Sequence, residues 1–343
     1  MAAGLKKVLV LSDWDSDGVV AAALIDYVQR YLKKFPLEEE VELHKRPLDA
    51  NGVKYLLSQI GEAYHTVVFL DVPYSDVLGN VVKMLKTHFG VKQVVFVDHH
   101  IGSLHKIDEV KKVFDIALVD YKRPTVAILY DELASRGIKV HEKLRLFVEV
   151  IRYMDSGKRV PEKLMKPFEI AKSISKALTA IRSEELWIKI VEWLSDPTPR
   201  PMPLDESAWS KAKDVIEKRD KEVKEVATRL AISAIKVGDF RFVDARSTWK
   251  KRGVTALASR LSAILKAPVA LVAGTNREYA LLILKAPGGR AFRIAKYLLA
   301  EGIAQDVAGH PNLAIVRIPK DLDKKQLIDC LLYTSDAADE RSR

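Results

Sequence analysis

The sequence predicts an α/β protein in which a mostly parallel sheet domain is joined by a long helix to a smaller α/β domain. Short Val-rich runs alternate with longer periodic segments over the first half of the chain. Strand–helix alternation of this kind is typical of a parallel sheet with helices on both faces. A proline-rich stretch, Ser195–Pro203, interrupts the pattern, and a second set of short apolar runs follows it. At 343 residues the chain is long enough for two domains.

The elements of the first domain follow from these runs. Five short apolar runs predict buried strands, at residues 7–11, 41–44, 66–70, 93–97 and 116–119. Four longer periodic segments predict helices, at residues 18–33, 75–89, 125–136 and 142–154. In parallel sheets of this kind, the chemistry collects at the carboxyl ends of the strands.

The segment after the first domain predicts a linker and a connecting helix. Four prolines between Pro197 and Pro203 cannot continue a helix and predict an extended linker. Apolar side chains then recur at helical spacing from Glu206 to Ile235. The second domain has predicted strands at residues 240–244, 269–272, 280–284 and 313–318, and predicted helices at 254–265 and 291–299. We therefore expect a first domain over residues 1–194, a linker and connecting helix over 195–236, and a second domain over 237–329.

The last stretch, residues 330–343, loses all periodic pattern. It resembles translated adapter sequence, and we expect it to be a non-native tail with no part in the function.

Composition limits the compartment and the class of partner. The 56 Lys and Arg against 46 Asp and Glu give a net charge of +10, which favours a polyanionic partner, although Lys-rich surfaces are also common for solubility. The single cysteine, Cys330, excludes a disulfide framework and a thiolate metal cage. No apolar run approaches the roughly 18 residues of a membrane span. Met1–Lys7 is too short and polar for a signal peptide. We expect a cytoplasmic protein that does not contact a membrane.

An acidic motif directly follows the first predicted strand. Asp13, Asp15 and Asp17 alternate along an extended segment and can converge on one side, and Gly18 lets the chain turn into a helix. Three carboxylates this close repel one another, and a bound cation offsets that repulsion. A calcium loop begins in the same way, but it needs a Glu where this chain has Leu24, and a helix where this chain has a strand. A solvated acidic turn is the plain alternative.

Two more predicted strands end in acidic or imidazole side chains. One delivers Asp71 and another delivers Asp98, His99 and His100. A single Asp after a strand is often only a helix cap. An adjacent pair of histidines is more informative, because one imidazole can bind a metal while the other faces substrate and a carboxylate orients a ring. Asp155 ends a predicted helix at a small-residue turn, where a helix terminus with an incidental acid is the plain alternative.

Together these residues form an Asp/His set at one edge of the predicted sheet. Oxygen-rich ligation with one or two imidazoles and no thiolate suits manganese or magnesium better than zinc. Two such ions about 3.5–4 Å apart generate a hydroxide near neutral pH and hold a phosphoryl group. The set comprises Asp13, Asp15, Asp17, Asp71, His99, His100 and Asp155.

This order of motifs resembles the DHH phosphoesterase family, which is named for the sequence Asp-His-His, here residues 98–100. The resemblance covers about residues 7–158 and implies two manganese ions, with magnesium as the alternative. It implies that Asp15 and Asp17 each bind one ion and that Asp71 bridges both. His99 and Asp155 would complete the second ion's ligands.

The resemblance also implies roles around the ions. His100 would contact the phosphate as a catalytic residue, together with Asp98 of the same motif. Asp13 would be an outer metal ligand or would support one, since this position varies in the family.

The second domain resembles the DHH-associated substrate-binding domain through residues 308–312, which include Gly309 and His310. The family pattern begins with a Gly pair and continues into Ala-Ala-Gly, whereas Ala308 precedes Gly309 here and Leu-Ala-Ile follows Asn312. A turn histidine without a ligand is the plain alternative for His310.

Basic and aromatic residues suggest where a polyanion would bind. Lys158 and Arg159 follow Asp155 closely, and Arg246 follows a predicted strand end, so we expect all three to bind substrate phosphates. Trp249 and Tyr279 are candidates for stacking on bases. Lys runs are more often simply solvated.

Members of the DHH family cleave single-stranded DNA, short oligonucleotides, cyclic dinucleotides, nucleotide phosphates or pyrophosphate. The first hypothesis is therefore a manganese-dependent phosphodiesterase, an exonuclease that trims single-stranded DNA or short RNA. The second is a phosphatase or phosphodiesterase acting on a nucleotide or cyclic dinucleotide. The third is a non-catalytic scaffold that binds replication or repair proteins. Inactive relatives typically lose motif acids, and all of them are present here.

Overall fold

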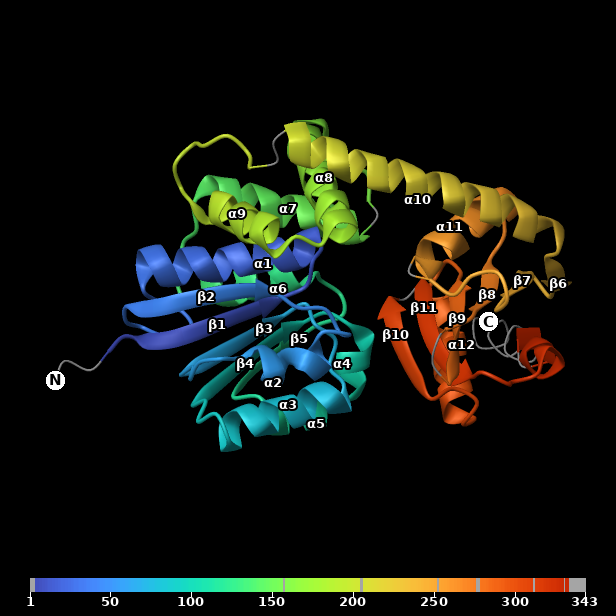
Figure 1. Cartoon of the computed structure of the whole chain (residues 1–343), viewed down its shortest axis with the longest axis horizontal. Coiled ribbons are helices and arrows are strands. Elements are labelled where there is room, and N and C mark those ends of the chain that lie inside the picture. The colour runs from blue at the N-terminus through green and yellow to red at the C-terminus, as the bar shows by residue number, and fades with distance from the viewer. Residues whose placement is uncertain are drawn as a thin grey trace. The chain divides into compact units, whose positions relative to one another are not determined.

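The chain forms two compact units, Met1–Ile216 and Glu217–Arg343, in the computed structural model (Figure 1). The structure describes residues 4–156, 158–203, 206–251, 253–275, 278–310, 312–329 and 331–332. No helix within these residues is both long enough and apolar enough to cross a membrane.

The first unit contains a five-stranded sheet in which every neighbouring pair is parallel. The spatial order is β2-β1-β3-β4-β5. The strands are β1 (Lys6–Ser12), β2 (Val41–Pro47), β3 (Thr66–Leu70), β4 (Gln93–Asp98) and β5 (Ile116–Val119). All five predicted strands are present, and because they run in one direction their carboxyl ends share one edge. The prediction that all five are buried is wrong for the two edge strands, β2 and β5, which are mostly only partly buried.

Helices surround this sheet. The four predicted helices are confirmed as α1 (Ser16–Tyr27), α3 (Asp76–Thr87), α6 (Thr125–Ser135) and α7 (Glu142–Ser156). The α-helical part of α1 ends earlier than predicted, because residues Val28–Leu32 form a π-helical turn that ends at a left-handed Lys33. The helices that the sequence did not predict are η2 (Val53–Tyr55), α2 (Leu56–Gln59), α4 (Ile101–His105), α5 (Ile107–Val113), η3 (Glu162–Leu164), α8 (Met165–Ile181) and α9 (Glu184–Ser195).

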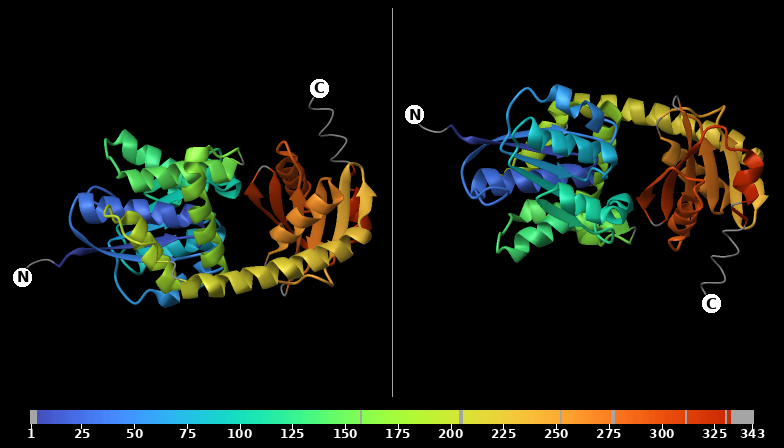
Figure 2. Two further views of the ribbon diagram at one scale, coloured as in Figure 1. Left: turned by 90° about the horizontal axis from the view of Figure 1, so that it is seen from above. Right: turned by 90° about the horizontal axis from the view of Figure 1, so that it is seen from below.

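Both faces of the sheet are buried, which explains the uninterrupted apolar runs of its strands. Val8 and Val10 of β1 pack into a core formed with α1, α6, α7, α8 and α9. Leu9 and Leu11, which alternate with them, pack into a second core with α3 and α5. Figures 1 and 2 show the helix layers on the two faces. A sheet fixed on both faces holds its strand ends in place, which is what a multi-residue site requires.

The second unit has a six-stranded sheet in the order β10-β11-β9-β8-β7-β6. Among its described strand pairs, only β7–β8 is parallel. Its strands are β6 (Ile235–Val237), β7 (Phe240–Ala245), β8 (Val269–Ala273), β9 (Tyr279–Lys285), β10 (Asp306–His310) and β11 (Leu313–Pro319). Its helices include α11 (Val254–Leu265) and α12 (Arg290–Ala300), both predicted. The four predicted strands are confirmed, and β6 and β10 are additional.

The predicted connecting helix is confirmed as α10 (Glu206–Ile232). Its later part is not a free connector, because Val223, Val226 and Leu230 belong to the core of the second unit. The boundary between the two compact units falls inside this helix, after Ile216. The predicted domain limits at 194 and 236 therefore differ from this division and stay a prediction.

Two residues after the connecting helix, Trp249 and Leu331, are buried. Trp249 is 1% exposed and lies in the hydrophobic core, so the prediction that it stacks on bases is wrong. Within the predicted tail, Leu331 is buried, whereas Cys330 and residues 333–343 lie outside the described residues.

Candidate metal centre

The acidic and imidazole residues predicted from the motifs meet at the carboxyl edge of the first sheet. β1, β3 and β4 deliver them from adjacent strands, and the end of α7 adds one more. Electrostatic interactions or direct contacts connect all of the predicted ligands, which are Asp13, Asp15, Asp17, Asp71, His99, His100 and Asp155.

The turn between β1 and α1 is fixed by its own side chains. Asp15 caps α1, because its Oδ1 accepts hydrogen bonds from the backbone N–H groups of Asp17 (3.0 Å) and Gly18 (3.1 Å). A Cβ at Gly18 would lie 2.7 Å from the carbonyl oxygen of Asp13, so only glycine fits there. The element before this turn is a strand, as the sequence predicted, which argues against a calcium-binding helix–loop–helix.

The start of α6 holds two of the carboxylates. The backbone N–H groups of Thr125 and Val126 donate to the two oxygens of Asp17, each at 2.8 Å. The Thr125 hydroxyl donates to Oδ1 of Asp71 at 2.9 Å. Helix N-termini favour negative charge, so α6 orients these acids without neutralising them fully. Thr125 was not among the predicted site residues, although its position at the start of a predicted helix was an available signal.

Asp71 has an unusual backbone conformation. Its φ is +59°, in the left-handed region that only Gly, Asn and Asp adopt with any frequency. Its N–H donates to the carbonyl of Val97 in the neighbouring strand at 2.9 Å, and the residue is 2% exposed. A strained backbone at a buried acid is typical of a functional site.

His99 lies among three acids. Its Nε2 is 3.4 Å from Oδ1 of Asp71 and 3.8 Å from Oδ2 of Asp17. Its Nδ1 is 3.9 Å from Oδ1 of Asp155. Potential ligand atoms of Asp71, His99 and His100 all lie within 4.8 Å of one another. This is the spacing of groups that can share a metal ion, and it does not by itself separate the predicted roles of the two histidines.

His100 is held by a buried chain of hydrogen bonds. Its Nδ1 lies 2.7 Å from Oδ1 of Asp98, and the Ser103 hydroxyl donates to the other oxygen of Asp98. The backbone N–H of Tyr74 donates to the Ser103 hydroxyl at 2.8 Å. Asp98 and Ser103 are fully buried, so the chain fixes the ring. Ser103 is a second residue that the motifs did not reveal.

Burial and charge shift the pKa values of this pair in opposite directions. Burial alone would raise the pKa of Asp98, but the charge of His100 and the hydrogen bonds from His100 and Ser103 lower it. Burial would lower the pKa of His100, but the charge of Asp98, with weaker effects of Asp71 and Asp13, raises it to about 10. In the metal-free protein the pair is therefore a carboxylate and an imidazolium at neutral pH.

The acids of the β1–α1 turn have raised pKa values. Burial and the charge of Asp71 raise the pKa of Asp15 to about 6. Burial and the charges of Asp15 and Asp71 raise the pKa of Asp13 well above its usual value. Burial and the charges of Asp71 and Asp15 also raise the pKa of Asp17 well above its usual value. These carboxylates lack a sufficient positive charge nearby, and a divalent cation would supply it.

The predicted basic residues of the first unit follow the end of α7 in the chain. Lys158 and Arg159 are both exposed, three and four residues after Asp155. Gly157, which completes the Asp-Ser-Gly motif, lies outside the described residues. The role of Lys158 and Arg159 in binding phosphate stays a prediction.

Two of the predicted substrate-binding residues of the second unit, Arg246 and Gly309, make close contacts within the protein itself. Nε of Arg246 lies 3.1 Å from each carboxylate oxygen of Asp244, and Nη1 donates to the carbonyl of Leu322 at 2.8 Å. Gly309 lies in β10, not in a loop, with a φ of +110°, and a Cβ there would be 2.3 Å from the carbonyl oxygen of Leu313. The side chain of His310 and all of Pro311 lie outside the described residues. None of these contacts requires a substrate, so the predicted binding roles remain untested.

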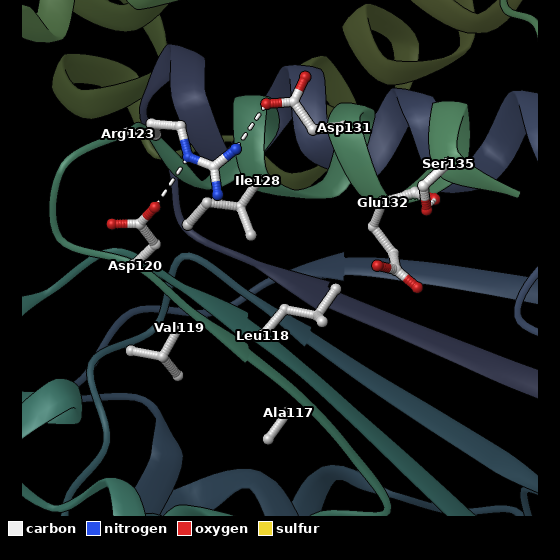
Figure 3. Close-up of a pocket in the computed structure, with 9 residues that line it drawn as sticks. All are labelled: Ala117, Leu118, Val119, Asp120, Arg123, Ile128, Asp131, Glu132 and Ser135. Atoms are coloured by element: carbon white, nitrogen blue, oxygen red, sulfur yellow. Dashed lines mark hydrogen bonds and ion pairs between the residues drawn. The ribbon is translucent and has the colours of Figure 1, made fainter.

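A pocket of about 430 Å³ lies between β5 and α6 (Figure 3). Arg123 bridges Asp120 (2.8 Å) and Asp131 (2.6 Å) at its rim. None of the acid and imidazole residues described above lines this pocket, so it is separate from the candidate metal centre.

Comparisons with known proteins agree with this architecture. No protein-family model matches the sequence, and no curated protein is significantly similar to it. Solved structures do match, and they include DHH-domain proteins, so the chain has a DHH-like fold.

Three of these structures indicate the range of the fold. A DHH domain described as a member of a family of ribosomal proteins has a TM-score of 0.60 and 15% identity, over 95% of this chain and 85% of its own. RecJ from Thermus thermophilus in complex with Mn²⁺ has a TM-score of 0.60 and 15% identity, over 96% of this chain. The match spans only 52% of that RecJ chain. PggH from Vibrio cholerae, a pGpG-specific phosphodiesterase, has a TM-score of 0.52 and 11% identity, over 97% and 99% of the two chains.

Proposed function

We propose that this protein is a metal-dependent phosphodiesterase that hydrolyses single-stranded DNA or short RNA. The observation that carries the proposal is the meeting of Asp71, His99 and His100 within 4.8 Å beside further carboxylates, at the carboxyl edge of a DHH-type sheet. Three carboxylates with raised pKa values support a site built for cations.

The donor set fits divalent ions that prefer oxygen. Carboxylates with one or two imidazoles and no thiolate suit manganese or magnesium. Asp15, Asp17, Asp71, His99 and Asp155 would hold two such ions, with Asp13 supporting them. When bound, paired ions of this kind lower the pKa of a bound water and stabilise the charge that develops on a phosphoryl group.

The protein's own groups would orient the substrate phosphate. Asp98 orients the ring of His100 through Nδ1, and Nε2 would meet a phosphate oxygen. An imidazolium at this position donates a charge-assisted hydrogen bond to the phosphate. Thr125 keeps Asp71 in one orientation, since its hydroxyl donates to the oxygen nearest His99.

The choice of a nucleic-acid substrate rests on charge and on relatives of the fold. The net charge of +10 favours a polyanion. RecJ structures share this fold, among them one described as an exonuclease bound to manganese. Exposed Lys158 and Arg159 close to Asp155 would contact phosphates beyond the scissile one.

A dinucleotide phosphodiesterase is the second candidate. It is favoured by the match to PggH, which extends over 97% of this chain and 99% of that one, whereas the match to Thermus RecJ spans about half of the RecJ chain. Both candidates use the same acid and imidazole residues and differ in how much of a strand must bind.

The test is a comparison of substrates in manganese. The wild-type protein and Asp71→Asn would be incubated with bis(4-nitrophenyl) phosphate, end-labelled single-stranded DNA, short RNA, pGpG and a cyclic dinucleotide. The proposal expects manganese-dependent hydrolysis, fastest on the oligonucleotides and lost in Asp71→Asn. Faster hydrolysis of pGpG would favour the second candidate. No hydrolysis of any diester would contradict both.

A further inference from the structure

An aromatic side chain stands inside the acidic motif. Trp14 lies between Asp13 and Asp15 in the turn after β1 and is partly exposed. The Arg182 guanidinium lies over its ring, 5.1 Å from the ring centroid. Trp14 is a direct chain neighbour of two candidate metal-site acids, so this aromatic–guanidinium pair lies at the same end of β1 as those acids. All of these residues belong to the first unit.

Arg182 occupies a position where glycine is the unstrained choice. It ends α8 with a φ of +54°, and its N–H donates to the carbonyl of Leu178 at 2.9 Å. Helices that end in the left-handed conformation usually have glycine there, because a Cβ is unfavourable. Glycine would adopt this conformation without strain, so the guanidinium can be removed here without a backbone cost.

The guanidinium is held in place from one side. Nη1 donates to Oδ2 of Asp49 at 2.8 Å, and the other oxygen of Asp49 accepts the N–H of Gly52 at 2.8 Å. Asp49 lies just after β2, so the arginine is anchored to the same sheet edge as the acids. The side chain keeps 33% of its surface exposed.

Its hydrogen-bonding capacity is not filled. Nε of Arg182 is buried and has no hydrogen-bond partner among the described residues. A guanidinium has five N–H donors in a planar fork that matches the oxygens of a phosphate. The exposed part of the Arg182 side chain lets an oxyanion reach this fork.

We propose that Trp14 and Arg182 form a nucleotide subsite beside the metal centre, in which the indole stacks on a base and the guanidinium binds a neighbouring phosphate. This inference rests on the proposed function and adds to it the recognition of a nucleoside next to the reacting phosphate. Stacking on an aromatic ring tolerates any base, since every base has a π-face. The subsite therefore selects nucleotides over simple phosphodiesters and not one sequence over another.

The structure offers a variant and a matched control. Arg182→Gly removes the guanidinium and relieves the left-handed strain, so this variant is expected to fold. Lys33→Gly makes the same change of charge at another left-handed helix end, with φ +55°, where the side chain pairs with Glu40 on the surface. Lys33 follows the carboxyl end of α1, whereas the acidic site lies at the amino end of that helix.

The experiment measures binding and selectivity together. Binding of fluorescein-labelled oligothymidylate is followed by anisotropy with calcium in place of manganese. The ratio of kcat/KM for the oligonucleotide to that for bis(4-nitrophenyl) phosphate is measured with manganese. We expect Arg182→Gly to weaken oligonucleotide binding about tenfold and to lower the ratio about tenfold. Trp14→Leu should weaken binding by a similar factor. Lys33→Gly should match the wild type in both measurements.

Two results would overturn the subsite. One is wild-type oligonucleotide affinity in Arg182→Gly and Trp14→Leu. The other is an equal loss on both substrates together with a lower melting temperature, which would show a purely structural role. If the wild type hydrolyses neither substrate, the proposed function fails, and the calcium binding assay still decides whether the subsite exists.

Discussion

The carboxyl edge of the first sheet and the strands of the second unit treat their charged residues differently. At the first edge, Asp15 and Asp17 come together with Asp71 and His99, and burial with mutual repulsion raises the pKa of both β1–α1 acids. In the second unit, Asp244 and Arg246 pair with each other, and although burial alone would raise the pKa of Asp244, hydrogen bonds from Arg246 lower it. The acids at the edge of the first sheet need a bound cation to offset their charge, whereas the charge of Asp244 is already neutralised by Arg246.

This difference indicates when a charged residue at a strand end is expected to bind a ligand. Acids that converge without a basic partner point to a ligand, because their repulsion costs stability that only a bound cation offsets. Asp244 lies near the end of β7, and the guanidinium of Arg246 in the following turn reaches back to it, so this acid has its partner within the same segment. The motif spacing alone therefore distinguishes Asp13, Asp15 and Asp17 from Asp244.

The largest expected effect is at the shared acid of the first region. Asp71→Asn should lower kcat/KM more than about 100-fold, because a ligand matters at least as much as the residues that support ligands. Asparagine tolerates the left-handed backbone of Asp71, so the fold should persist. Steady-state kinetics with circular dichroism as the folding control tests this. More than about a tenth of wild-type activity would contradict the two-metal arrangement.

A smaller loss is expected at the residue that positions His100. Ser103→Ala removes the hydroxyl that donates to Asp98 and should lower kcat about 10-fold, with manganese affinity near that of the wild type. Ser103→Thr retains the hydroxyl and should recover much of the activity. The measurement is kcat and KM for both variants. Equal activity in Ser103→Ala and the wild type would show that Asp98 needs no such support.

The acidic region should also show a pH signature in the metal-free protein. The folded pKa of Asp15 is raised to about 6 from the ordinary 3.8, so its stabilising contribution is present below pH 3.8 and is lost as the pH rises through 6. Asp15→Asn keeps a helix cap without the charge. Without metal, the variant should therefore gain melting temperature relative to the wild type between pH 4 and pH 7.

Manganese should reverse this trend in the wild type, because metal binding requires deprotonated carboxylates. The rise in melting temperature on adding manganese should be larger at pH 7.5 than at pH 5. Thermal unfolding at the two pH values measures it. An equal rise at both would mean that Asp15 does not bind the metal.

The smallest effect on catalysis is expected in the second unit. Arg246→Gln breaks a partly buried ion pair and the bond to the Leu322 carbonyl, and should lower the free energy of unfolding by about 1–3 kcal/mol. Its kcat/KM should stay within about twofold of the wild type. A fall of more than tenfold in kcat/KM for oligonucleotides would instead support the prediction that Arg246 is a phosphate ligand.

The first sheet and its acidic edge were predictable because β1, β3 and β4 contain unbroken apolar runs that end at or next to a motif residue. It missed the roles of Thr125 and Ser103, because their hydroxyls act on acids 54 and 5 residues away and carry no local pattern. Trp249 was misinterpreted as a stacking aromatic because composition does not distinguish a buried ring from an exposed one. β10 was missed because Gly309 is a residue typical of turns. In the structure this glycine lies within a strand, where it allows the close approach to β11.

The most direct test of the central claim is a calorimetric titration of the metal-free protein with manganese at pH 7.5. We expect two ions per chain in the wild type and a loss of at least one in Asp71→Asn, with both retained in Arg246→Gln. No binding to the wild type, or the same stoichiometry and affinity in Asp71→Asn, would contradict the assignment of a two-metal centre to the carboxyl edge of the first sheet.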